Sequence, residues 1–235
     1  MTKIRYSEIE IAGGLISALN FAFKKMGSEL RVSNEDDPNF FPGAFAQIEK
    51  NNKLSQIYIA SEEKLYLPDF WRDGVCLANG GVNDIDLLVE CIDYWLNSQE
   101  STKQLANKFS FVTPYKNAAV FDEGKEVEYA WKLILNSEYS KEIRSFVELA
   151  INDEILSKLY PFTSLMTLCF SRCTGYPYTG DTPTITPIFE TDRYLVRNSD
   201  GDEIGSGSAS EALKMVLCNL PTDIGPAVKG TADDL

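Results

Sequence analysis

The segment "CFSRCTGYPYTGDTP", residues 169–183, brings two cysteines, one arginine and two tyrosines close together. The guanidinium of Arg172 could bind a carboxylate or phosphate through two hydrogen bonds, with the hydroxyl of Tyr176 adding a third. It could equally neutralise nearby acidic groups or bond to loop carbonyls. A reactive thiolate at Cys169 or Cys173 would need a nearby base, and the chain contains no histidine. We expect two structural thiols on one face of a strand.

Tyr176 and Tyr178 stand among three prolines, Pro177, Pro183 and Pro187. Proline fixes the backbone and cannot donate to a sheet ladder, so the sequence predicts a strand that runs into a rigid loop. The two tyrosines either anchor a protein interface, where tyrosine gives a large contact area at low entropy cost, or pack onto their own domain.

The composition argues against several common reactions. Without histidine there is no Ser-His or Cys-His pair and no His-ligated zinc or iron site. Adjacent acidic pairs such as Asp153 and Glu154 are typical of a solvated face, whereas glycosidase or metal chemistry needs carboxylates that converge in a cleft. The segment "GSGSAS", residues 205–210, lacks the lysine of a phosphate-binding loop. We therefore expect no catalytic residue, no cofactor and no metal.

The chain of 235 residues has a formal charge of −13. This charge repels nucleic acid and anionic lipid and attracts a basic partner, although it could also serve only to keep the protein soluble. The five cysteines, an odd number set mostly in apolar runs, indicate reduced, buried thiols. No apolar stretch is long enough to span a membrane and no export signal is recognisable, so we expect a cytoplasmic protein.

The hydrophobic spacing predicts an α+β fold with two antiparallel sheet-plus-helix lobes joined by a helical middle segment. We expect lobes at residues 1–110 and 159–235 and an acidic helical connector at 111–158. Helices are expected over residues 6–26, from a cap at Asn83, around residues 127–134 and 143–151, and from a cap at Ser210. Strands are expected at residues 30–33, 44–49, 54–60, 64–67, 75–77, 165–171, 184–189, 194–197 and 203–206.

A shift of the chain by 127 residues superimposes two similar segments. It places Asp73-Gly74 on Asp200-Gly201 and Cys91 on Cys218, and both segments then read as a hairpin followed by a helix. Duplication of one lobe would explain the similarity, and so would chance combined with shared turn chemistry.

The connector is acidic, with nine Asp and Glu against four Lys and Arg over residues 122–154. We expect its outer faces and the tyrosine loop to contact a partner. The candidate partner-binding residues are Asp122, Glu123, Glu126, Glu128, Arg172, Tyr176 and Tyr178.

Two segments, "LYPFTSLMTLCFSRCTGYPYT" at 159–179 and "LPTDIGPAVKGTADDL" at 220–235, resemble an uncharacterised bacterial family labelled as associated with natural-product biosynthesis. That label describes gene neighbourhood more than chemistry, so the resemblance implies no catalytic residue. It implies a role in defining the fold for Phe162, Ser171, Arg172, Cys173, Gly175, Tyr176, Pro177, Gly225, Pro226, Gly230 and Thr231.

The overall profile also resembles the immunity proteins of bacterial polymorphic toxins. We therefore expect a non-catalytic immunity protein whose partner is a basic toxin domain. The alternative is an accessory protein or enzyme of natural-product biosynthesis that binds an anionic small molecule through Arg172. A third interpretation is a scaffold without a dedicated ligand.

Overall fold

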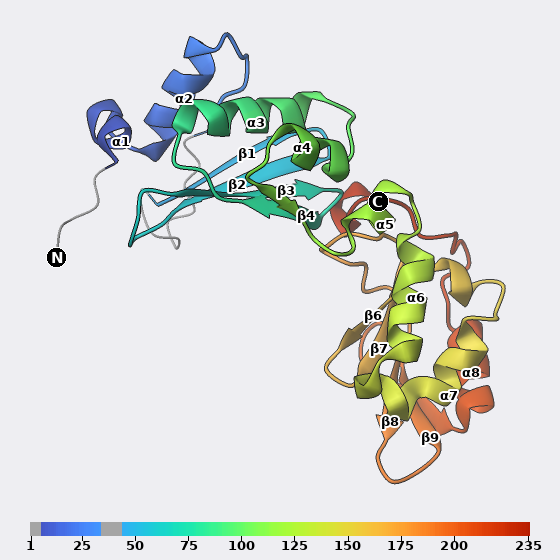
Figure 1. Ribbon diagram of the computed structural model, residues 1–235. Coiled ribbons are helices and arrows are strands. Elements are labelled where there is room, and N and C mark those ends of the chain that lie inside the picture. The colour runs from blue at the N-terminus through green and yellow to red at the C-terminus, as the bar shows by residue number, and fades with distance from the viewer. Residues whose placement is uncertain (1–5, 34–43) are drawn as a thin grey trace. The chain divides into compact units, whose positions relative to one another are not determined.

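The computed structural model describes residues 6–33 and 44–235 and has an α+β fold (Figure 1). The chain divides into two compact units, residues 1–122 and 123–235. Each unit contains a five-stranded sheet whose neighbouring strands are antiparallel. The predicted α+β class with two antiparallel sheets is therefore confirmed. Within the described residues, no helix is both long enough and apolar enough to cross a membrane.

In the first unit the strands follow one another as a meander, in the order β1-β2-β3-β4-β5. One face of the sheet carries the buried side chains Ile57, Phe70 and Leu77, and it packs against α2 and α3. Period-two alternation places the intervening side chains, both polar and apolar, on the other face. The elements are α1 (Ser7–Ala12), α2 (Leu15–Lys25), β1 (Phe45–Lys50), β2 (Lys53–Ile59), β3 (Tyr66–Arg72), β4 (Val75–Gly80), α3 (Ile85–Asn97), α4 (Thr102–Lys108), β5 (Val112–Pro114) and α5 (Ala118–Asp122).

The sheet of the second unit has the order β10-β9-β8-β7-β6. Its core joins Phe170 and Val196 from the sheet to Trp131, Phe146 and Val216 from the helices. The elements are α6 (Glu126–Asn136), η1 (Glu138–Ile143), α7 (Arg144–Ala150), η2 (Leu156–Lys158), β6 (Tyr160–Ser164), β7 (Thr167–Ser171), β8 (Thr184–Ile188), β9 (Arg193–Arg197), β10 (Glu203–Gly207), α8 (Ala209–Cys218) and η3 (Ala232–Asp234).

The helix expected over residues 6–26 is two helices, because the chain breaks at Gly13 and Gly14. Both glycines have positive φ, +81° and +142°, which side-chain-bearing residues rarely adopt. A Cβ at either position would meet nothing within 4 Å, so the glycines supply backbone freedom and do not admit a close neighbour.

Other local expectations also differ from the structure. Residues 30–33 are not a strand, and β5 and β6 were not expected. The caps are Asp84 for α3 and Ser208 for α8, in place of Asn83 and Ser210. Ser208 forms a capping box with Glu211, whose carboxylate accepts hydrogen bonds from the Ser208 amide (2.8 Å) and the Ser208 hydroxyl (2.9 Å). Residues 34–43, between the strands expected at 30–33 and 44–49, lie outside the described residues.

Residues 111–158 are divided between the two units. Strand β5 and helix α5 complete the first unit, whereas α6 and α7 pack on the second sheet. The two hairpins related by the 127-residue shift, β3–β4 and β9–β10, both turn at an Asp-Gly pair and are both followed by a helix. Each unit thus contains four strands in meander order before its helix, β1–β4 and β7–β10.

Glu8 ties α1 to the first sheet. Its carboxylate lies 2.6 Å from the ammonium of Lys64 and accepts a hydrogen bond of 2.6 Å from the hydroxyl of Tyr66. Burial would raise the pKa of Glu8, but the hydrogen bonds from Lys64 and Tyr66 outweigh it and lower this pKa to about 2.

We expect Glu8→Gln to lower the free energy of unfolding by about 1–2 kcal/mol at pH 7, after allowance for partial solvent screening. Because the folded-state pKa lies below the usual value, this contribution is present above about pH 4.5 and is lost as the pH falls towards 2. Urea unfolding should therefore separate the variant from the native protein clearly at pH 7 and by a smaller margin at pH 3. Glu10→Gln, an exposed change on the same helix, should match the native protein at both.

Candidate functional site

Four aromatic rings gather where β6 meets the loop that follows β7. We call Tyr160, Phe162, Tyr176 and Tyr178 the tyrosine platform. The ring of Tyr178 stacks on Phe162 with centroids 4.4 Å apart and on Tyr160 at 5.6 Å, and Tyr176 meets it edge-on at 6.0 Å. Tyr176 is 71% exposed, whereas Tyr178 is half-buried. The loop therefore uses one tyrosine to pack on its own unit and displays the other.

The loop is held in shape by the segment 228–232. The amide of Val228 donates to the carbonyl of Arg172 (2.9 Å), and the Val228 carbonyl accepts from the amide of Thr174 (3.0 Å). Two further backbone bonds follow, from Gly175 to the carbonyl of Gly230 (2.8 Å) and from Ala232 to the carbonyl of Pro177 (2.7 Å). The peptide bond between Tyr176 and Pro177 is cis. The predicted rigid loop is thus fixed along both sides of the exposed ring.

Ser171 and Cys173 lie beneath this loop and are fully buried. The Ser171 hydroxyl oxygen accepts from the amides of Cys173 (3.0 Å) and Thr179 (3.2 Å) and lies 3.3 Å from the Cys173 sulfur. Strand β7 ends at Ser171, so Cys173 is not on the strand and does not share a face with Cys169. The hydroxyl serves to close the loop, and the enclosed thiol is out of reach of a substrate.

All five cysteines are free thiols, but they are not all buried. Cys91 is buried, and burial raises its thiol pKa, as it does for Cys169. Cys218 is exposed. Within the described residues, no group of three or more histidine, cysteine or acidic side chains is placed to hold a metal ion.

Arg172 forms an ion pair with Asp181, with Nη2 2.7 Å from Oδ2. Its backbone amide donates to the hydroxyl of Thr179 (3.0 Å). Arg172 Nε and Asp181 Oδ1 are buried and have no hydrogen-bond partner in the described part of the chain. The arginine therefore neutralises a nearby acid, the second of the two roles expected for it, and offers little free charge to an anionic ligand.

The four acidic candidates do not form one surface. Glu123 and Glu128 are exposed, and each pairs with a lysine, Lys125 at 2.7 Å and Lys132 at 2.5 Å. Glu126 is only 5% exposed, and its Oε2 lacks a partner among the described residues. The pKa of Tyr160 is raised first by burial, then by Tyr178, and further by the charge of Glu126. Glu126 therefore acts on the tyrosine platform, whereas Glu123 and Glu128 face solvent.

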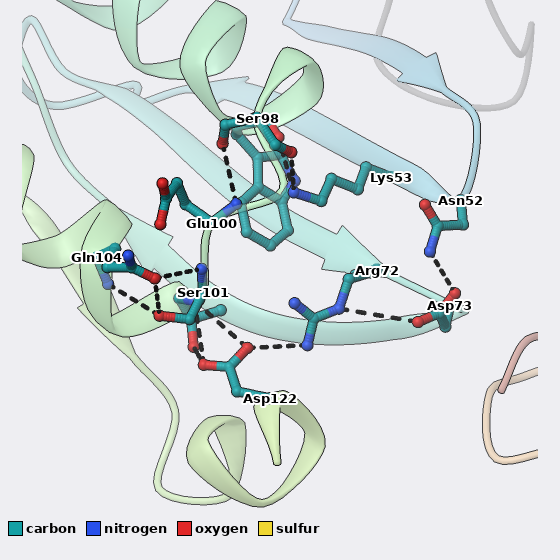
Figure 2. Close-up of polar contacts among 11 residues, drawn as sticks. Asn52, Lys53, Arg72, Asp73, Ser98, Glu100, Ser101, Gln104 and Asp122 are labelled. Carbon is teal, nitrogen blue, oxygen red and sulfur yellow. Dashed lines mark hydrogen bonds and ion pairs between the residues drawn. The ribbon is translucent and has the colours of Figure 1, made fainter. Parts of the chain in front are cut away.

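Asp122 belongs to the first unit and to a different cluster (Figure 2). Its Oδ1 lies 2.8 Å from Nη2 of Arg72, and its Oδ2 accepts from the amide (3.1 Å) and the hydroxyl (2.6 Å) of Thr102. The side chains of Arg72 and Asp122 are only 15% and 11% exposed. Asp122 thus joins the end of α5 to β3 and to the start of α4, and it adds little to the charge that a partner would meet.

Lys53 lies opposite Arg72 in the register of β2 and β3, within the same cluster. Its ammonium donates to the carbonyls of Trp95 (3.0 Å) and Ser98 (2.8 Å) at the end of α3 and lies 4.2 Å from the Trp95 ring centroid (Figure 2). Burial, followed by the charge of Arg72, lowers the pKa of Lys53 to about 8. These hydrogen bonds make Lys53 a cap of the carboxyl end of α3. Because Lys53 is only 5% exposed, its ammonium cannot reach a substrate.

Tyr160 was not singled out from the sequence, and Phe162 was expected only to help define the fold, not to belong to the candidate site. They alternate along β6, so period two puts both rings on one face of the strand. This signal was present in "LYPFTS", but a proline beside Tyr160 speaks against a strand there.

The comparisons with known proteins concern mainly the second unit. No curated protein and no solved structure matches the chain. Residues 125–231 match a family of unknown function (DUF6193). The matched residues include α6, α7 and the tyrosine platform. The match begins well before Leu159, the start of the segments that carry the resemblance described above.

Proposed function

We propose that the protein is a non-catalytic binding protein of the cytoplasm, and more specifically an immunity protein that covers a basic surface or the active site of a toxin domain. The observation that carries this proposal is the presentation of Tyr176. Its ring is exposed, and its loop is already ordered by the hydrogen bonds to residues 228–232. A side chain that is ordered before association loses little conformational entropy on binding, and tyrosine is common among the residues that dominate interface energies.

Charge supports a basic partner. Residues 123–235 contain 18 Asp and Glu against 10 Lys and Arg, so the unit that presents Tyr176 is itself acidic. Complementary charge speeds encounter between partners and disfavours acidic competitors. The alternative, binding of an anionic natural-product intermediate through Arg172, has weaker support because Asp181 already compensates the guanidinium.

We expect Tyr176→Ala to weaken binding of the partner at least about tenfold, or about 1.4 kcal/mol, because a central aromatic contact is lost. The partner is first isolated by copurification from a lysate of the native host, identified, and then titrated in purified form by calorimetry. Phe189→Ala is the matched control, since Phe189 is 62% exposed on the same unit but lies at the turn after β8.

Salt dependence tests the charge argument separately. Raising the salt concentration should weaken the complex progressively if a basic surface is bound. The proposal fails if the purified partner is acidic, if salt has no effect, or if Tyr176→Ala and Phe189→Ala bind equally well. Loss of a metabolite in Arg172→Ala cells that otherwise resist the toxin would support the natural-product alternative instead.

A further inference from the structure

The sheet of the first unit has a hollow on the face that α2 and α3 do not cover. Its volume is about 550 Å³, within the range of sites for small molecules and single side chains. We refer to it as the sheet hollow. It is lined by Tyr58, Leu67, Asp69, Asn79, Gly80, Gly81, Phe111 and Thr113.

A row of polar side chains crosses the sheet at the hollow. Gln56 on β2 stands opposite Asp69 on β3, Asp69 stands opposite Asn79 on β4, and Asn79 stands opposite Thr113 on β5. Residues directly opposite on antiparallel strands share a face, so the four side chains form one continuous line. Asp69 is the acidic member, at the centre of the sheet.

The carboxylate of Asp69 has no ion pair within residues 6–33 and 44–235, the described part of the chain. It is half-buried, and burial raises its pKa. Its negative charge also reaches the neighbouring acids, because the pKa values of Tyr58 and Cys76 are raised first by burial and then by the charge of Asp69, that of Cys76 to about 12. The hollow therefore contains a partly desolvated negative charge without a compensating cation.

The walls of the hollow suit a flat or compact cation. Tyr58 and Phe111 provide aromatic surface on two sides, and ring faces attract guanidinium and ammonium groups. The glycine at position 80 allows Phe111 to approach, since a Cβ there would lie 3.0 Å from the Phe111 carbonyl and 3.1 Å from its ring. The amide of Asn79 is fixed by its hydrogen bond of 3.0 Å to the hydroxyl of Tyr115. The amide of Asn79 and the ring of Phe111 are thus held in place before a ligand arrives.

We propose that the sheet hollow binds the side chain of an arginine or a lysine on a basic polypeptide, with the carboxylate of Asp69 as the counter-ion. Its residues are separate from the tyrosine platform, so the proposal does not depend on Tyr176. The proposal states which side chain of a partner the first unit would bind, and it does not require that partner to be a toxin.

The test is a titration of the ¹⁵N-labelled full chain at pH 7.5 with two peptides, acetyl-Gly-Arg-Gly-amide and the same peptide with neutral citrulline in place of arginine. We expect saturable chemical-shift changes at Asp69, Asn79 and Gly81 with the arginine peptide only. Asp69→Asn should weaken its binding at least tenfold, whereas Glu90→Gln, the same loss of charge on α3, should not change it. The ¹⁵N spectrum of Asp69→Asn without peptide, compared with that of the native protein, distinguishes loss of binding from loss of folding.

Three results would overturn the proposal. Equally tight binding of the citrulline peptide would show that the positive charge of the arginine side chain is not recognised. Native-like binding by Asp69→Asn, or chemical-shift changes confined to other parts of the chain, would show that the peptide does not bind in the sheet hollow. Tighter binding of free putrescine than of the arginine peptide or its lysine counterpart would assign the hollow to a small amine and not to a polypeptide side chain.

Discussion

Asp122→Ala is expected to lower the free energy of unfolding of the first unit by about 3–5 kcal/mol, the cost of removing one partner from a buried ion pair. The change leaves Arg72 with only its more distant acidic partner, Asp73 at 3.8 Å, and leaves the amide and hydroxyl of Thr102 without their acceptor. Lys53 lies opposite Arg72 on the neighbouring strand, so two cations would then face each other with less acidic compensation. Amide hydrogen exchange measures the loss, because it reports the stability of each unit separately.

Glu123→Ala provides the control, since it removes the same charge one residue later. Glu123 is exposed and pairs with Lys125, which is exposed too, so we expect a change below about 0.5 kcal/mol. Exchange protection should fall in β2 and β3 of the Asp122 variant and stay constant in β7 and β9. Equal protection in both variants would show that the ion pair of Arg72 and Asp122 contributes nothing to the first unit.

Ser171→Ala is expected to lower the free energy of unfolding of the second unit by about 2–4 kcal/mol. Its hydroxyl oxygen is the acceptor for the buried amides of Cys173 and Thr179, and an unsatisfied buried donor costs about 1–3 kcal/mol. Because those two amides flank the tyrosine loop, the variant should also bind the partner less tightly than the native protein.

Ser210→Ala is the same chemical change at an exposed position of the same unit, and it should be nearly neutral. Exchange protection of β7 and β8, measured for both variants, gives the comparison. If Ser171→Ala were as stable as Ser210→Ala, the hydroxyl would not be what closes the loop, and another role for Ser171 would have to be sought.

The sequence predicted the elements whose signals are local. The helical spacing of Leu88, Ile92 and Trp95 indicated α3, and the Asp-Gly pairs at 73–74 and 200–201 indicated the two hairpin turns. Such signals depend on a few neighbouring residues, and they suffice for the α+β class.

Features that depend on tertiary context were missed or misplaced. Glycine lowers helix propensity, so Gly13 and Gly14 weaken the helix expected over residues 6–26. Only their positive φ values show that the helix ends there and does not continue through them. Asn83 and Asp84 are both good capping residues, and the path of the chain after β4 decides between them. Strand β5 has three residues and forms because β4 offers it a free edge.

In the candidate site, too, local features could be predicted from the sequence and tertiary contacts could not. The rigidity of the tyrosine loop followed from its prolines, but the residue types left open whether Tyr176 is displayed or packed, and the support of the loop comes from residues 228–232, far along the sequence. The partner of Arg172, Asp181, lies nearby in the chain but could not be chosen from among so many acids. Asp122 shows the converse error, because an acidic residue in an acidic segment was assigned to a surface and is instead largely enclosed.

The support of the tyrosine loop by residues 228–232 has a consequence for biosynthesis. Translation proceeds from the amino terminus, so the ribosome completes Tyr176 and Tyr178 well before the residues that brace them. A nascent or prematurely terminated chain that stops before Val228 would carry both tyrosines on a loop that lacks its hydrogen bonds to residues 228–232. If the loop binds a partner as proposed, binding would be acquired late in synthesis, and a chain that ends before Val228 should bind less tightly.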